Sequence, residues 1–147
     1  MKATMAYAAK RAVRTALVAQ TGTGQPLEGW QVAYSYPARD ITRKVIYLGG
    51  VRSTRTELSE EQNLVAAEQV TVGLYLRVLR PDADVEAADA NVETAADAIA
   101  ALFEAQPHLG GNMTWLGVIT GNGDYSESPD GPESVLSLQI LVGAVLI

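Results

Sequence analysis

A strict alternation of apolar and other residues between Ala66 and Arg80 constrains the fold of this chain more than any other feature. Val70, Val72, Leu74, Leu76 and Val78 alternate with Thr71, Gly73, Tyr75 and Arg77. Successive side chains of a β-strand point to opposite faces, so a period of two indicates a strand with one buried face. The segment therefore predicts a long, half-buried strand that ends at Pro81.

Two other segments have the period of amphipathic helices. Residues 84–105 carry an apolar stripe with acids on the opposite side, and Pro107 and Gly110-Gly111 end the pattern. Residues 4–20 predict a shorter helix, with small and apolar residues on one face and Lys10, Arg11 and Arg14 on another. The apolar stripe of the long helix consists of Val85, Ala88, Val92, Ala95, Ile99, Leu102 and Phe103.

The remaining segments predict shorter strands and two irregular regions. We expect strands at residues 31–36, 43–48, 113–120 and 135–147. Residues 51–63 are polar without a clear period and predict a long loop, and residues 121–133 are typical of a flexible turn region. The order α-β-β-β-α-β-β predicts an α+β fold, in which two helices pack on one face of a mostly antiparallel sheet. Residues 1–147 are expected to form a single domain.

The composition excludes several kinds of active site. The chain has no cysteine, which excludes disulfides and thiolate chemistry, and His108 is its one histidine, which excludes a multi-histidine metal site. The glycine motifs at residues 22–24 and 121–123 lack the lysine and the spacing of phosphate loops. No window approaches the roughly 20 apolar residues of a membrane span. We therefore expect a soluble protein without enzyme activity, cofactor or metal.

Charge is unevenly distributed along the chain. The formal net charge is −6, yet all 11 lysines and arginines lie at or before Arg80, and 11 of the 17 acids follow it. One interpretation is that the two halves interleave in the fold, so that their fields partly cancel. The other is a subunit with one basic and one acidic side, which would suit head-to-tail contact with copies of itself.

Three groups of charged residues are candidates for binding surfaces. Arg52 and Arg55 are the most partner-like cations, because they lie close together in the expected loop, where Glu60 and Glu61 form a carboxylate pair. Spacing of four residues places a second group of acids on one helix face. This second group consists of Asp89, Glu93 and Asp97. Each group could be merely solvated; the helix acids could instead meet a basic patch on a neighbouring subunit or line a channel.

In the order of its expected elements and the residues at their ends, the chain resembles the tail terminator, or tail completion, proteins of long-tailed bacteriophages. This group includes lambda's minor tail protein U. The resemblance covers nearly the whole chain and depends on no single signature motif. Its landmarks are an N-terminal helix, Val32-Ala33-Tyr34-Ser35-Tyr36-Pro37, Val45-Ile46-Tyr47-Leu48-Gly49-Gly50, Glu68-Gln69-Val70-Thr71-Val72, Arg80-Pro81-Asp82 before a long helix, Leu109-Gly110-Gly111 and an apolar last strand.

This resemblance implies a structural virion protein. Such proteins form a ring, usually of six copies, that ends polymerisation of the tail tube and offers the surface that joins the head. The implied partners are further copies of the chain, the tail tube protein and a head-completion or neck protein, while DNA passes through without specific binding. The residues expected at the subunit interface are Arg52, Arg55, Glu60 and Glu61, and those expected to face the lumen are Asp89, Glu93 and Asp97.

Other functions remain open at this point. A head-closure, neck or tail-tube ring protein could carry the same pattern. A small cytosolic α+β module that dimerises and binds a small molecule is the alternative from another class, and a carboxylate enzyme is a third. The last strand favours a partner, because Leu141, Val145 and Ile147 add apolar residues opposite its core-facing set.

Overall fold

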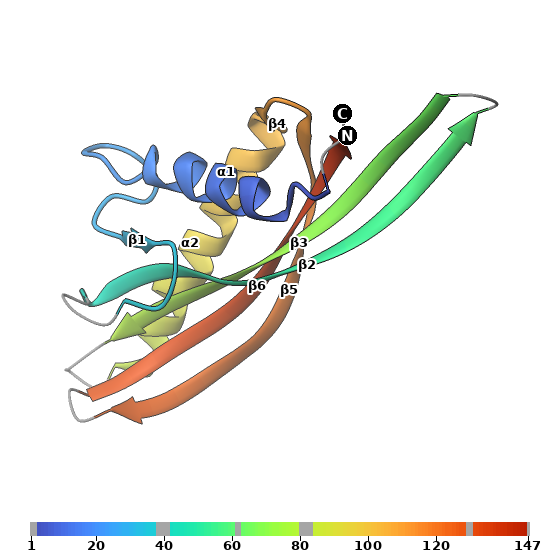
Figure 1. The fold of residues 1–147 in the computed structure, drawn as a ribbon. Helices are drawn as coiled ribbons and strands as arrows, with labels where there is room; N and C mark the ends of the chain where they lie inside the picture. Colours follow the sequence, from blue (N-terminus) through green and yellow to red (C-terminus); the bar gives the residue numbers. More distant parts are fainter. Residues whose placement is uncertain (1–2, 38–41, 61–62, 80–83, 129–130, 147) are drawn as a thin grey trace.

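The computed structural model describes residues 3–37, 42–60, 63–79, 84–128 and 131–146, although the side chains of some strand residues are not placed. These residues form two helices and six strands (Figure 1). The elements are α1 (Ala6–Val18), β1 (Gln31–Ala33), β2 (Lys44–Glu60), β3 (Asn63–Leu79), α2 (Val85–Ala105), β4 (His108–Gly110), β5 (Met113–Ser128) and β6 (Gly131–Leu146).

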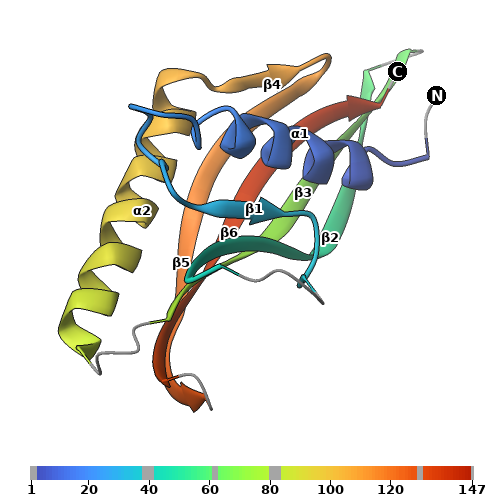
Figure 2. The ribbon, with the colours of Figure 1, turned by 90° about the vertical axis from the view of Figure 1, so that its left-hand side faces the viewer.

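The six strands form one sheet with both helices on the same face. The strand order is β1-β2-β3-β6-β5-β4, and every neighbouring pair is antiparallel except β1 with β2. Figure 2 shows α1 and α2 together on one side of the curved sheet. The α+β prediction is confirmed, with two differences: the sheet is mixed because β1 is parallel, and the short β4 was not predicted.

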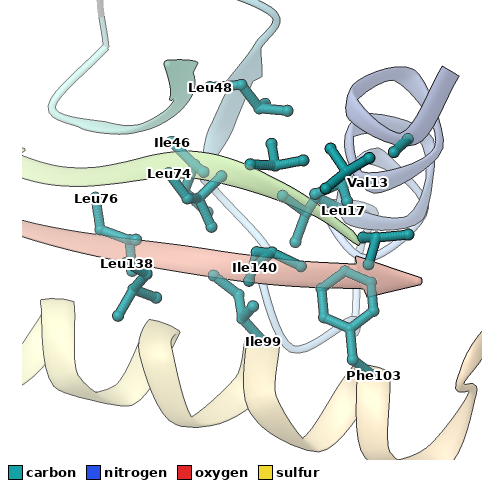
Figure 3. Packing of buried hydrophobic residues seen from close by; sticks show 14 of the residues in the cluster. Val13, Leu17, Ile46, Leu48, Leu74, Leu76, Ile99, Phe103, Leu138 and Ile140 are labelled. Carbon is teal, nitrogen blue, oxygen red and sulfur yellow. The ribbon is translucent and has the colours of Figure 1, made fainter. Parts of the chain in front are cut away.

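The core lies between the two helices and one face of the sheet. The alternating positions of β3 are buried as expected, with Val70, Leu74 and Leu76 at 0% exposure. Phe103 and Ile99 extend from α2 toward Leu138 and Ile140 of β6, and Val13 and Leu17 of α1 complete the cluster (Figure 3). Trp30 also belongs to this cluster, and the ring of Trp115 lies against Phe103 with the ring centroids 6.0 Å apart.

The long helix was predicted almost to the residue. Asp84 is the N-cap, and its side chain accepts a hydrogen bond from the backbone N–H of Ala87, which satisfies one of the free donors of the first turn. Ala88, Val92, Ala95, Ile99 and Phe103 are its buried positions.

The prediction of a loop at residues 51–63 is wrong. The described part of this segment belongs to a long hairpin, in which β2 continues to Glu60 and β3 begins at Asn63. Figure 1 shows this hairpin extending well beyond the helices. Arg52, Thr54 and Arg55 are exposed, so no buried face imposes an apolar period on the sequence.

Gly49-Gly50 does not end a strand, as the sequence suggested, but marks an irregularity within one. The pairing of β2 with β3 shifts register between Leu48 and Val51, which is a β-bulge. A Cβ atom at Gly49 would lie 2.7 Å from Cε2 of Tyr75, so the ring packs directly on the glycine backbone. The bulge therefore requires a residue without a side chain at this position.

The prediction of a flexible turn region at residues 121–133 is also wrong. Strand β5 runs to Ser128 and β6 begins at Gly131, so most of the segment forms the arms of a second hairpin. Its glycines and polar residues suggested a turn, but they lie within the hairpin, where the pairing shifts register between Thr120 and Gly123. A Cβ at Gly121 would lie only 2.8 Å from the backbone oxygen of Ser137, so a close approach of two strands explains this glycine.

Truncation of Phe103 tests the packing of α2 on the sheet. Phe103→Ala should lower the free energy of unfolding by about 3–5 kcal/mol, because it removes a fully buried ring and leaves a cavity. The measurement is urea unfolding followed by circular dichroism. Glu104→Ala, at an exposed position one residue away, is the control and should change stability by less than about 0.5 kcal/mol. Equal effects of the two substitutions would contradict the described packing.

Candidate assembly surfaces

The arginines expected at an interface lie on the protruding hairpin, but they do not form one cluster. Arg52 lies opposite Thr71 and Arg55 lies opposite Glu68 in the pairing of β2 with β3. Because the two arginines are three positions apart in a strand, an odd number, they lie on opposite faces of the hairpin. Glu60 is the last residue of β2, and its side chain is not described; Glu61 lies outside the described residues.

The acids of α2 are exposed, and the structure divides them into two kinds. Asp89 accepts a hydrogen bond of 2.5 Å from the hydroxyl of Ser134, which ties it to the beginning of β6. Glu93 and Asp97 lie exposed on the outward face of the helix. Glu93 and Asp97 are therefore the members of this group that remain open to a partner.

A buried carboxylate, which the sequence analysis missed, joins three segments at the base of the hairpin. Glu68 is 3% exposed and accepts hydrogen bonds from the hydroxyl groups of Thr4 and Ser53, at 2.5 and 2.7 Å. It also accepts one from the backbone N–H of Met5 at 3.0 Å. A signal was present in the sequence, because Glu68 occupies the same alternate positions as Val70 and the other core residues of β3.

The hydrogen bonds of Glu68 determine its protonation. Burial by itself raises the pKa of this carboxyl group. The hydrogen bonds from Thr4, Ser53 and Met5, together with the positive charge of Arg55, outweigh that effect and hold the pKa below its ordinary value of 4.5. Glu68 therefore stays ionised in the folded protein at neutral pH and anchors the start of the chain to both strands of the hairpin.

The sheet face away from the helices is partly apolar. Leu116, Ile119 and Val145 are exposed on β5 and β6, which agrees with the expectation that the last strand is apolar on more than its core face. Leu141 is half-buried, and Ile147 lies outside the described residues. An antiparallel sheet that exposes one face to solvent usually carries polar residues on that face. The exposed apolar residues here therefore favour a surface that binds a partner.

An aromatic and ionic group lies toward the other end of this face. The rings of Tyr47 and Tyr75 stack with centroids 5.0 Å apart, and Tyr36 meets Tyr47 edge-on at 5.2 Å. Arg77 donates a hydrogen bond to the hydroxyl oxygen of Tyr36 at 2.7 Å and forms an ion pair with Glu133. Burial raises the pKa of the Tyr47 hydroxyl, although the charge of Arg77 opposes this effect.

A third surface gathers cations around one aromatic ring beside α1. The Lys10 ammonium lies 4.1 Å from the centroid of the Tyr34 ring, and the Arg14 guanidinium carbon lies 5.5 Å from it. We call Lys10, Arg14 and Tyr34 the basic cluster. The spacing of Lys10 and Arg14 places both on one face of the N-terminal helix, but nothing in the sequence indicates that Tyr34 lies against them.

The described residues offer little for catalysis or metal binding. An open cavity of about 290 Å³ lies between α1, α2 and β4, and its lining includes Ala12, Ala16, Leu102 and His108. Within the described ranges, no three potential histidine, cysteine or carboxylate ligands gather in a group that could hold a metal ion. Neither described helix combines the length and the apolar character needed to span a bilayer.

Comparison with known proteins supports the fold. No protein-family model matches the chain, and no curated protein matches it. Among solved structures, it is similar to a chain of the virion of a native gene transfer agent particle, with a TM-score of 0.54 and 14% sequence identity. The likeness covers 97% of this chain and 100% of that chain. The two chains therefore share a fold over essentially their whole lengths.

The buried carboxylate predicts a loss of stability in acid. Because the pKa of Glu68 is lowered in the folded state, its stabilising effect is fully present above the ordinary value of 4.5 and is lost as the pH falls through the lower, folded value. Glu68→Gln should destabilise the protein by about 1–3 kcal/mol at pH 7 and flatten this acid dependence. Urea midpoints measured between pH 7 and pH 3 test both effects. An unchanged acid slope in the variant would exclude Glu68 as its source.

Proposed function

We propose that this chain is a structural protein of a phage-like virion that forms a ring on the end of the tail tube, stops tail polymerisation and provides the surface for joining the head. The observation that carries the proposal is the likeness, over both whole chains, to a component of a gene transfer agent virion. That likeness supports a virion protein in general. The terminator role rests in addition on the landmarks of the sequence.

The surfaces of the molecule support a role in assembly. A long hairpin extends beyond the body, apolar side chains lie on the uncovered sheet face, and charged groups of opposite sign lie on different elements. A ring needs two different patches on each subunit, and these features offer them. A closed ring would use these surfaces without any catalytic group, so we propose no enzyme activity and no cofactor.

The proposed partners follow from the place in the particle. Six copies would contact one another in the ring, with the tail tube protein on one side and a head-completion or neck protein on the other. DNA would pass through the ring without specific binding, because the net charge of −6 disfavours contact with phosphate groups. The protein would be made in the cytoplasm of the host bacterium and would end in the virion, in the neck or tail.

Two alternatives have support in particular features. A head-closure, neck or tail-tube ring protein would use the same fold and surfaces at a different position in the particle. A dimeric ligand-binding module would use the cavity of about 290 Å³ between α1, α2 and β4. The cavity is small and open, whereas the exposed hairpin and sheet face have no role in such a module.

The assembly state separates these functions. Native mass spectrometry of the purified protein over a range of concentrations should show a closed ring, with six copies as the expected number. A stable dimer would favour the ligand-binding module and would be followed by ligand screens. A monomer at every concentration would contradict a ring that assembles on its own.

Charge reversal on the hairpin tests its part in assembly. Arg52→Glu should reduce ring formation or the joining of heads to tails, because it replaces an exposed positive charge by a negative one that would repel an acidic partner. Circular dichroism should show an unchanged fold. Arg55 is less suitable alone, because its charge also acts on the buried Glu68. Arg52→Lys is the matched control and should behave like the wild type. Unchanged phage yield with Arg52→Glu would show that Arg52 does not contribute to the interface.

A further inference from the structure

The basic cluster beside α1 holds two cations without a carboxylate partner in the described part of the chain. Lys10 is only 9% exposed, and its ammonium contacts the face of the Tyr34 ring. Arg14 lies one helical turn away over the same ring. An aromatic face attracts a cation only weakly, whereas a carboxylate would add a charge-assisted hydrogen bond. Two like charges at this spacing also repel each other, so an acidic partner would relieve the repulsion.

The acidic face of α2 has the complementary chemistry. Glu93 and Asp97 are exposed, and α2 contains no lysine or arginine along its whole length. Neither acid has an ion pair or hydrogen bond among the described residues, in contrast to Asp89, which is bonded to Ser134. The repulsion between neighbouring acids on one helix face would be relieved by a cation from outside.

The two surfaces cannot meet within one copy. Lys10 and Arg14 lie on the flank of α1 that faces Tyr34. Tyr34 directly follows β1, which is the strand at one edge of the sheet. The opposite flank of α1 carries Ala12 and Ala16, which line the cavity shared with α2. Helix α2 covers β3, β6 and β5, toward the other edge of the sheet (Figure 2). The basic cluster and the acidic face therefore belong to different sides of the subunit.

We propose that the basic cluster of one copy binds the acidic face of α2 on the next copy. The contact is heterologous, because a different patch of each copy takes part, and such contacts close into rings when the rotation between copies allows it. It rests on the proposed ring and assigns Glu93 and Asp97 to the boundary between subunits rather than to the channel. Arg14 would supply the charge that reaches these carboxylates, and Tyr34 would hold the cations in place.

A charge exchange tests the pairing. Arg14→Glu and Glu93→Arg should each weaken self-association at least about tenfold in Kd, because each places like charges opposite one another. The chain that carries both substitutions should regain most of that affinity, since the pair is restored with its signs exchanged. Arg14→Lys, which keeps the charge, is the matched control. Native mass spectrometry and sedimentation at about 50 and about 500 mM salt provide the readout, and wild-type association should weaken at the higher salt.

The outcomes distinguish this contact from the ring itself. A wild-type ring that neither single substitution weakens would overturn the contact, leave the ring in place and favour the channel position for the acids. Weakening by both single substitutions without recovery in the combined chain would also overturn the pairing. Association that depends on both charges but stops at an open dimer would support the contact and contradict the closed ring. A wild-type monomer at about 50 mM salt would overturn both the contact and a ring that assembles on its own. Thermal melts of all variants verify that they are folded.

Discussion

The burial of only one face of the β3–β6 pair is the constraint on which the rest of this structure depends. Strand β3 pairs with β2 on one side and β6 on the other, so its apolar face lies at the centre of the core under both helices. Burying Val70, Leu74 and Leu76 requires the helices to lie on that face, and the opposite face stays uncovered. The position of α1, of α2 and of every candidate assembly surface follows from this asymmetry.

Burial also explains how much of the fold could be predicted. Helix α2 and the central part of β3 follow from the sequence because one side of each element contacts the core, and the period of apolar residues records that contact. The outer parts of β2 and β5 show no such period of apolar residues. Their pairing depends on backbone hydrogen bonds with a neighbouring strand, which polar and glycine-containing segments can also form, so residues 51–63 and 121–133 suggested loops.

The candidate surfaces could be predicted only in part. Charge and spacing identified the exposed acids of α2 and the arginines of the hairpin, but not that Arg52 and Arg55 lie on opposite faces. Glu68 shows what sequence alone leaves out, because its partners Thr4 and Ser53 are 64 and 15 residues away. Tyr34 likewise meets Lys10 and Arg14 only through the folding of β1 against α1.

The bulge at Gly49 lies at the base of a long arm, so a small rotation at this point would move the far end of the hairpin much further. From Val51 to Glu60 the arm of β2 spans about 30 Å, at about 3.3 Å per residue, so a rotation of about 10° at its base would displace its far end by about 5 Å. The ring of Tyr75 against the glycine and the hydrogen bonds of Glu68 resist that rotation at two successive points of the arm. A few contacts near the base of the arm thus determine its direction, and a small change in them would produce a larger displacement at its far end.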